Sequence, residues 1–566
     1  MSKSRMALAA CAALLIATPA ADAAGGKKEG TPADPQAKHF IKKISVDRMT
    51  AHQQDLQDIA DANGGNRAAL NEEGTIGSGY QASVDYVVDE LESYGYDAKI
   101  NMFNHPFWEE TAPALLQLNG SAAPYTPGTA ADDGSPDVDF ITMANSEAIN
   151  LQDVPIVPID VVDPPVGGST SGCQQADYDA APDLTGKVAL IQRGECSFVA
   201  KWALAEENGA VGVIIYNEGN TPARQNPIFV DNGIDTEIAA VITSYTVGNE
   251  LLQAYKSGSN PTVDFVVNAR FTDRFLPQVL AETKKGDKDN VVVVGGHLDS
   301  VIEGPGINDD GSGVAMLLTM AEELSQQRYK LQQQVRFMFF GAEEDGLVGS
   351  QYYAHSLTDA QVAKIDAMLD YDMLASANYA RFVYDGDGSE PGNEDFKGPE
   401  GSGFIEQLHD DWFDAQGQFN ERIPFDGRSD YVGFTDEGIP AGGIFSGAEV
   451  PKTEEQEAIY GGDAGSAYDP CYHEACDNTT TVFTGIPPLD AGGLDGVTDA
   501  ERAANAQKMA GLALKSYDEM SDAASYATWY LATQDTPFSD APTGKKKGKA
   551  KAGKRLKARS DHSKSR

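Results

Sequence analysis

The segment that most constrains this chain is VVVVGGHLDSVIEGPGINDDGSG, residues 291–313. Residues 291–294 are all valine, and an unbroken β-branched run of this kind predicts a strand buried on both faces in a parallel sheet. Two glycines end the run, and His297 and Asp299 follow at once. Open α/β sheets bind ligands beyond the carboxyl ends of their strands. We therefore expect His297 to lie at such an edge, on a rigid support.

A glycine-rich loop follows and carries the next polar residues. Glycines at positions 304, 306, 311 and 313 predict a tight loop, and an apolar helix is expected to begin near Val314. The loop presents Asp309 and Asp310 before that helix. His297 and Asp309 can therefore reach the same metal ion, although they lie twelve positions apart.

Two further apolar runs carry acidic residues in the same way. Residues 335–340 predict a second strand, which a glycine ends just before Glu343 and Glu344. Residues 367–371 predict a third strand, which leads to Asp372. Neighbouring carboxylates seldom share one role, so one of Glu343 and Glu344 can bind metal while the other transfers protons.

A last histidine, His473, lies far along the chain in the polar loop YDPCYHEACD, residues 468–477. Any one of these residues alone would more often be a surface carboxylate or a hydrogen-bonded core histidine. Together they supply two histidines and several carboxylates, most of them directly after strand-like runs. That combination indicates a hydrolase with two metal ions.

The order of these motifs resembles that of a known family. GGHLDS, GINDDGSG, GAEEDGLVGS, YDM, GRSDY and DPCYHEACD occur over roughly residues 290–480, in the order found in the secreted di-zinc aminopeptidases of metallopeptidase family 28. The resemblance implies an α/β fold with a mixed, mostly parallel sheet flanked by helices. It also implies hydrolysis of the N-terminal peptide bond of peptides.

The same resemblance implies a ligand set for two zinc ions. Asp309 would bridge the ions, and His297 and Asp372 would complete one site. Glu344 and His473 would complete the other. Manganese or cobalt could substitute for zinc, because oxygen-rich ligand sets suit these metals as well.

Two more roles follow from the resemblance. Glu343 would be the general base, which takes a proton from a water activated by two zinc ions and passes it to the leaving amine. Asp299 would be a carboxylate behind His297 that fixes the tautomer and orientation of the imidazole.

Arg428 and Asp430 in GRSDY, and Tyr472 beside His473, are candidates for the substrate pocket. A salt-bridged turn between Arg428 and Asp430 is the structural alternative.

Two other functions stay open. A metallo-carboxypeptidase of the same family would need several Arg or Lys side chains to hold a terminal carboxylate. A catalytically inactive relative would be an interaction protein, and the full ligand set argues against that.

Residues 1–24 have the pattern of a secretory signal peptide. Lys3 and Arg5 precede an apolar run over residues 6–17, and an Ala-rich segment then offers a cleavage site. Cys11 fits a lipid-attachment motif, but only five apolar residues precede it and the run continues beyond it. We expect a secreted, periplasmic or extracellular protein. No other stretch reaches the ~18 apolar residues of a membrane helix, so no membrane span is expected.

Without the signal peptide, Cys173, Cys196, Cys471 and Cys476 remain. An even number of cysteines in an oxidising compartment predicts disulfides. Cys471 and Cys476 flank His473, and the family resemblance supports a bond between them, which leaves Cys173 and Cys196 as the other pair. Zinc bound by cysteine is the weaker alternative, because these spacings are not those of a zinc finger.

The peptidase domain is expected in two parts, residues 40–111 and residues 271–535. The first part ends in a predicted strand over residues 98–103, and the second closes with a long helix over residues 499–533.

The intervening residues, 112–270, are expected to form an insert with its flanking strands. Residues 186–220 closely resemble a protease-associated domain, a β-rich module. It carries no catalytic constellation of its own, so it is a candidate lid or a plain structural insert.

The last segment, residues 540–566, differs from the rest in charge. From Gly544 onward it holds eleven Lys or Arg against Asp561, about +10, whereas the whole chain carries −43. A block of like charge is expected to be disordered, and contact with polyanions, removal after export and a solubilising role all remain open. The acidic body argues against nucleic acid as a partner and leaves peptides as the expected substrates. A salt-rich habitat would screen this acidity.

Overall fold

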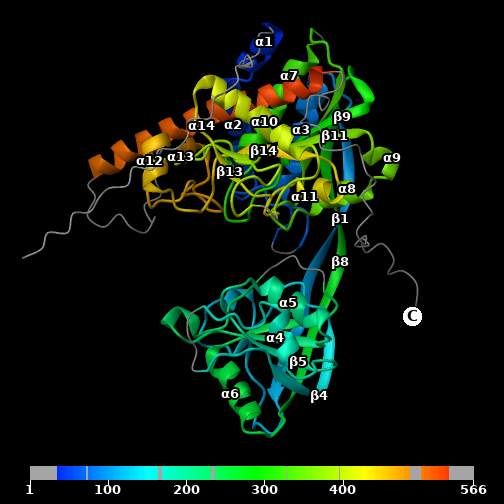
Figure 1. Ribbon diagram of the computed structural model, residues 1–566, viewed down its shortest axis with the longest axis vertical. Coiled ribbons are helices and arrows are strands. Elements are labelled where there is room, and N and C mark those ends of the chain that lie inside the picture. Colours follow the sequence, from blue (N-terminus) through cyan, green and yellow to red (C-terminus); the bar gives the residue numbers. More distant parts are fainter. Residues whose placement is uncertain are drawn as a thin grey trace, which may run out of the picture.

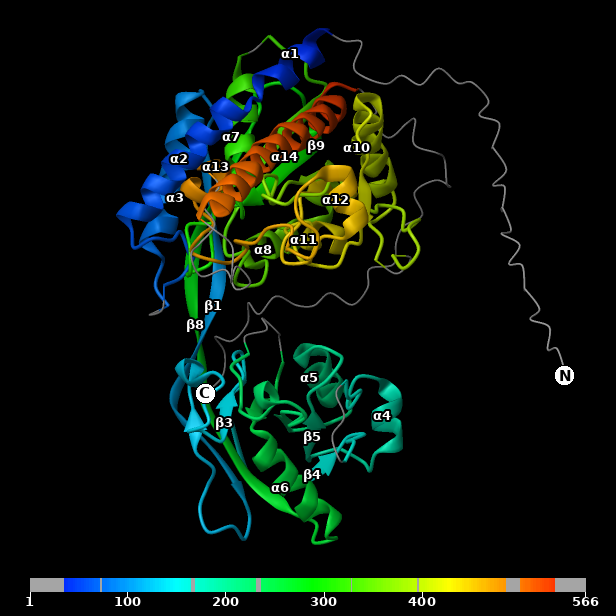
Figure 2. The same ribbon diagram turned by 90° about the vertical axis from the view of Figure 1, so that its left-hand side faces the viewer.

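The computed structural model describes residues 35–71, 74–163, 168–230, 236–326, 328–393, 396–484 and 499–534. The predicted signal peptide and the basic tail lie outside the described residues. The chain forms two bodies joined by a two-stranded ribbon (Figures 1 and 2). Among the described residues, no helix combines the length and apolar character needed to cross a membrane.

The larger body is built on a mixed sheet whose centre is parallel. The central strands, in spatial order, are β14 (Ala441–Phe445), β11 (Ile365–Asp370), β9 (Asp287–His297) and β10 (Gln333–Phe340). Antiparallel strands flank this centre: β12 (Phe382–Tyr384) pairs with β14, and β8 (Thr262–Glu282) pairs with β10. A short strand, β13 (Glu421–Ile423), extends the edge beside β12. The three strands predicted from apolar runs are thus confirmed as neighbours.

Helices cover both faces of this sheet. One face packs against α1 (Pro35–Lys43), α2 (Val46–Ala62), α3 (Ser78–Ser93), α7 (Gly311–Ser325), α10 (Ser402–Gln416) and α14 (Asp499–Thr533). The other face packs against α8 (Val348–Ser356) and α11 (Val432–Asp436). The body also contains α9 (Asp359–Val362), α12 (Glu454–Tyr460) and α13 (Thr479–Thr484).

The valine run of β9 is apolar throughout because both faces of this strand are covered. Val292 and Val294 belong to the core under α7 and α14, whereas Val291 and Val293 belong to the core under α8 and α11. Successive side chains of a strand point to opposite faces, so a strand covered on both faces needs apolar residues at every position.

The ribbon consists of β1 (Lys99–Leu118) and the antiparallel β8. Their pairing runs from Lys99 opposite Leu280 to Leu118 opposite Val263, with irregular register between Glu110 and Leu115. β1 is therefore much longer than the strand predicted over residues 98–103, because it continues out of the larger body into the second one (Figure 2).

The second body has its own parallel strands, β4 (Ile149–Pro158), β5 (Val188–Gln192), β6 (Gly212–Tyr216) and β7 (Ala240–Thr243). Strands β3 (Phe140–Thr142) and β2 (Pro127–Gly128) extend this sheet beyond β7. Its helices are α4 (Gln175–Ala180), α5 (Phe198–Glu207) and α6 (Tyr245–Lys256), with short 3₁₀ turns η1 (Ala130–Asp132) and η2 (Pro222–Arg224). The strand, helix and strand predicted within residues 186–220 are confirmed as β5, α5 and β6.

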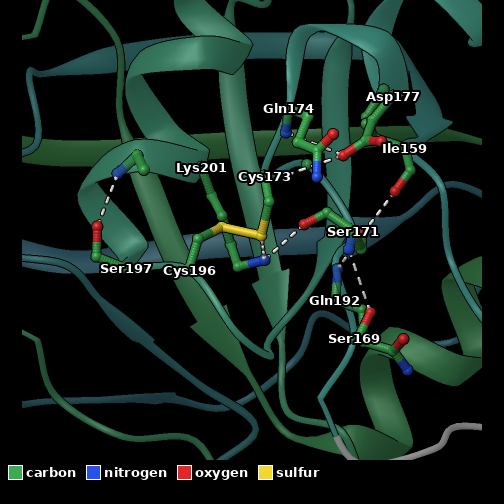
Figure 3. Close-up of a disulfide and its surroundings, with 12 residues drawn as sticks. Ile159, Ser169, Ser171, Cys173, Gln174, Asp177, Gln192, Cys196, Ser197 and Lys201 are labelled. Atoms are coloured by element: carbon green, nitrogen blue, oxygen red, sulfur yellow. Dashed lines mark hydrogen bonds between the residues drawn. A yellow bond between two sulfur atoms is a disulfide. The ribbon is translucent and has the colours of Figure 1, made fainter. Parts of the chain in front are cut away.

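A disulfide joins Cys173 to Cys196 in this body, with an S–S distance of 2.06 Å. Lys201 points toward it from α5 (Figure 3). The Lys201 ammonium donates a hydrogen bond to the carbonyl of Ser171 at 2.5 Å and lies 3.4 Å from the Cys173 sulfur. Burial lowers the pKa of Lys201 to about 8. The disulfide and this buried amine together tie the loop before α4 to the start of α5.

In the larger body, one buried arginine fixes the loop that follows β9. Arg67, between α2 and α3, is fully buried. Its guanidinium donates hydrogen bonds to the carbonyl oxygens of Pro305 at 2.8 Å, Gly306 at 2.6 Å and Leu298. The residue after His297 is therefore held by a side chain from far upstream.

Replacing Arg67 tests this account of the loop. Arg67→Met keeps the length of the side chain but leaves three buried carbonyls without donors, so we expect the free energy of unfolding to fall by about 3 kcal/mol or more. Arg48→Met is the matched control, because Arg48 forms a partly exposed pair with Glu322 and donates an exposed hydrogen bond to the carbonyl of Lys43, and such exposed contacts contribute about 1 kcal/mol or less. Urea denaturation measures both. Equal losses would contradict the role given to Arg67.

Candidate metal centre

The predicted ligands converge at one edge of the sheet of the larger body. β9, β10 and β11 are parallel neighbours, so the residues after them emerge side by side. His297 ends β9, Glu344 follows β10, and Asp372 follows β11. Asp309 comes from the loop before α7. His473 enters from the loop closed by the disulfide between Cys471 and Cys476, which has an S–S distance of 2.09 Å.

Asp309 lies between the two histidines. Its Oδ1 is 3.1 Å from Nε2 of His297, and its Oδ2 is 3.4 Å from Nε2 of His473. On one side, Asp372 Oδ1 lies 3.6 Å from the same nitrogen of His297. On the other, Glu344 Oε2 lies 2.9 Å from His473 Nε2. The five residues thus form two groups of three that share Asp309.

This arrangement fits two metal ions. Within the described residues, Glu344 Oε1 and Asp372 Oδ1 are buried without a hydrogen-bond partner. Buried polar atoms are normally paired, so these two oxygens indicate a ligand. Imidazole and carboxylate are ordinary zinc donors. Glu343 is also near, with Oε2 4.0 Å from Nε2 of His297, and it forms a further possible group of three with His297 and Glu344.

The protonation of these groups reflects crowding of like charge. Burial raises the pKa of Glu343 well above its usual range, and burial together with Asp309 raises that of Glu344 to about 7. Burial alone would lower the pKa of His473, but hydrogen bonds to Asp309 and Glu344 raise it to about 10. The site therefore demands positive charge, which a protonated imidazole or a metal ion can supply.

Asp299 contacts His297 differently from the prediction. The Nδ1 atom of His297 lies 3.1 Å from the backbone carbonyl oxygen of Asp299, whereas the carboxylate is 3.9 Å away. That carboxylate instead accepts hydrogen bonds from the backbone N–H groups of Glu343 and Glu344, each at 3.2 Å. The backbone of Asp299 orients the imidazole, and its side chain holds the loop after β10.

Two further carboxylates support the centre, although the sequence assigned a role to neither of them. Asp310 Oδ2 accepts from the backbone N–H of His297, and its Oδ1 accepts from those of Gly313 and Met373. Asp477 accepts from the backbone N–H of Asp309 at 3.0 Å. Asp310 directly follows the predicted ligand Asp309 in the sequence, and that position could have indicated a supporting role. No comparable feature of the sequence indicated a role for Asp477.

A cavity of about 310 Å³ opens beside the ligands. Arg428 and Tyr472, two of the candidates for the substrate pocket, line it together with the apolar side chains of Met373, Phe382, Tyr384, Ile423, Phe445 and Tyr468. Asp430 is a correction: it is fully buried and does not line the cavity. The alternative of an Arg428–Asp430 salt bridge is also wrong, because Arg428 pairs with Glu449 at 2.9 Å.

Comparison with known proteins agrees with this geometry. Residues 278–485 match the model of peptidase family M28, and residues 155–251 match that of the PA domain. An aminopeptidase of Pseudomonas aeruginosa is 39% identical over 471 residues, which cover 83% of this chain and 80% of that protein. The chain belongs to peptidase family M28. Its insert is a PA domain.

Other M28 relatives agree. A probable leucine aminopeptidase 2 of Aspergillus fumigatus is 39% identical over 408 residues, covering 72% of this chain and 74% of that protein. Among solved structures, an aminopeptidase from Aneurinibacillus sp. strain AM-1 superposes with a TM-score of 0.56 at 24% identity, covering 88% of this chain and 96% of that chain. At this identity the superposition supports the fold alone.

Zinc should stabilise the protein if these residues form the metal site of an M28 peptidase. A ligand present at about 100 times its Kd stabilises the folded state by about 2.7 kcal/mol. A gain of 1 kcal/mol raises the Tm of a body of more than ~250 residues by about 1 to 2 °C, so we expect the Tm to rise by about 3 to 5 °C in zinc. The shift should be smaller at about pH 6 than at about pH 8, because protons compete with metal for the ligands.

The matched pair for this measurement is His473→Ala and His355→Ala. His473→Ala should reduce the zinc-dependent shift strongly. His355 pairs with Asp436 at 3.4 Å on α8, and His355→Ala should leave the shift unchanged. A zinc shift that survives His473→Ala intact would exclude this residue as a ligand.

Proposed function

We propose that this chain is an exported metallo-aminopeptidase, which hydrolyses the N-terminal peptide bond of peptides with the help of two zinc ions. The observation that carries the proposal is the position of Asp309, whose two oxygens face His297 and His473 beside a largely apolar cavity. A single carboxylate between two histidine-containing groups suits a pair of ions. The P. aeruginosa and A. fumigatus relatives, named as aminopeptidases, support the same activity.

His297, Asp309 and Asp372 would hold one ion, and Asp309, Glu344 and His473 the other. When bound, such ions polarise the scissile carbonyl and lower the pKa of a water, as manganese or cobalt could also do. The residues of the protein hold the reacting groups in position. The loop closed by Cys471 and Cys476 holds His473, and Asp299 holds the amides of Glu343 and Glu344.

Glu343 is the general base of this proposal. It is one residue from the ligand Glu344, lines the cavity, and is not needed to complete either group of three around Asp309. It would take a proton from the attacking water and deliver it to the nitrogen of the leaving amine.

The charges around the cavity favour a substrate with a free amino group. A carboxypeptidase needs cations that face the substrate, yet Arg381 pairs with Glu519 and Arg422 pairs with Glu406. The Lys452 ammonium donates to backbone carbonyls of Tyr379 and Gly461. Arg428 lines the cavity, but Glu449 neutralises it. Carboxylates such as Glu343 and Asp372 remain as partners for a terminal ammonium.

Export rests on the signal-peptide pattern of residues 1–24 and agrees with the two disulfides, which persist in oxidising compartments. A metallo-carboxypeptidase of the same family is the second candidate, and the end of the peptide that is cleaved separates the two.

Blocked peptides test which end is cleaved. We expect a leucine-initiated peptide to lose single residues from its amino end, to be cleaved equally well with an amidated carboxyl end, and to resist cleavage once its amino end is acetylated. Mass spectrometry of the products distinguishes these outcomes. Cleavage that survives acetylation but stops after amidation would replace the aminopeptidase with a carboxypeptidase.

The two adjacent glutamates should separate metal binding from proton transfer. Glu343→Gln should keep the zinc-dependent rise in Tm and lose activity by ~10² to 10⁴, the usual range for a general base. Glu344→Gln serves as the matched variant and should lose the metal shift as well. If Glu343→Gln lost the metal shift while Glu344→Gln kept it, the two roles would be exchanged.

A further inference from the structure

His105 occupies the point where the ribbon leaves the peptidase body. It lies in β1 opposite Arg274 of β8, and its side chain turns inward and is largely buried. The Nε2 atom lies 2.9 Å from Oδ2 of Asp345. Asp345 directly follows Glu344 in the loop after β10. A strand that leads to the PA domain thus touches the loop that carries Glu343 and Glu344.

That loop has backbone hydrogen bonds of its own, from Gly346 and Leu347 to the carbonyl of Glu343, and it is also held from outside. Ala342 and Leu347 have φ angles of 55° and 61°, in the left-handed region that side chains other than glycine seldom adopt. Such conformations persist only when neighbouring contacts hold them. Asp299 supplies one contact, at the amides of Glu343 and Glu344. His105 supplies another, at the side chain of the next residue.

The base of the ribbon is itself fixed to the peptidase body. The hydroxyl of Tyr80 donates to the carbonyl of Pro277 at 2.5 Å. The side chain of Gln278 donates to Asn101 at 2.9 Å and to the carbonyl of Gly349 at 3.0 Å. His105 therefore projects from an anchored segment, and its ring can serve as a fixed point for Asp345.

The next residues of β1 contact the PA domain. The indole N–H of Trp108 donates to the carbonyl of Ser146 at 2.8 Å, and the hydroxyl of Thr142 donates to Glu110 at 2.9 Å. Only a few residues of one strand therefore separate the metal-binding loop from contacts within the PA domain.

We propose that His105 is a positioning residue, through which the ribbon of the PA domain holds the Glu343 and Glu344 loop in its working conformation. This deepens the proposed function, because it assigns a further residue to the same site. Nδ1 of His105 is buried without a hydrogen-bond partner among the described residues, so the bond to Asp345 is the polar contact that orients the ring.

Hydrogen exchange of the loop tests the proposal without relying on activity. In the full-length protein as purified, His105→Ala should raise the exchange rate of the amides of residues 341–347 by about 10-fold, because their outer support is lost. His105→Gln should restore slow exchange, since its amide nitrogen can replace Nε2 as the donor to Asp345. Asn104→Ala is the control, because Asn104 bonds to Asp273 within the ribbon at 2.9 Å and not to the loop.

Zinc binding and kinetics give a second readout. Groups that orient metal ligands commonly change metal affinity or activity 10- to 100-fold, and we expect the low end, about 10-fold weaker zinc binding for His105→Ala. The kcat should fall with little change in KM, whereas Asn104→Ala should change neither. His105→Gln should recover most of both losses.

Each outcome separates this inference from the proposed function. Exchange in residues 341–347 that is the same for His105→Ala and wild type overturns the positioning role, whatever the activity. A loss in His105→Ala that His105→Gln fails to recover also overturns it. Faster exchange of the loop in a protein without aminopeptidase activity would support the positioning role and reject the proposed function.

Discussion

The structure of the peptidase body depends on how it holds several carboxylates together at one edge of its sheet. Asp309, Glu343, Glu344 and Asp372 all lie within reach of His297 or His473. In the low dielectric of a buried site such charges repel one another strongly. The two histidines, and metal ions in the proposed function, supply the compensating positive charge.

A second group of carboxylates makes this crowding tolerable by bonding to backbone amides. Asp299 accepts from the loop after β10, Asp310 from the end of β9 and the start of α7, and Asp477 from the loop at Asp309. These bonds satisfy buried N–H groups and fix the ligands before any ion binds. Arg67 does the same for the carbonyls that follow His297. These surrounding hydrogen bonds thus hold the site residues in place, rather than attractions between the site residues themselves.

The PA domain is connected to the peptidase body through two paired strands. It is attached through β1 and β8 rather than through a flexible linker, and both strands continue into the peptidase sheet (Figure 1). The connection is therefore a hydrogen-bonded ribbon, with irregular register between Glu110 and Leu115. His105 lies where that ribbon passes the loop that carries Glu343 and Glu344.

The sequence by itself determined three strands of the parallel sheet and the polar residues that follow them. The β-branched run over residues 291–294 favours a strand covered on both faces, and neighbouring parallel strands bring His297, Glu344 and Asp372 to the same edge. Apolar runs and the residues after them are local features, so they can be recognised without a structure, whereas the pairing of the strands depends on the tertiary fold.

Only the tertiary structure decided which polar groups meet across long distances in the chain. Asp430 sits in a cavity-lining motif yet is buried, and Arg428 pairs with Glu449 instead. The carboxylate of Asp299 holds a loop rather than the imidazole beside it in sequence. His105 and Asp345 are 240 positions apart. Such pairs depend on how packed elements bring side chains together, and no local pattern of residues encodes that.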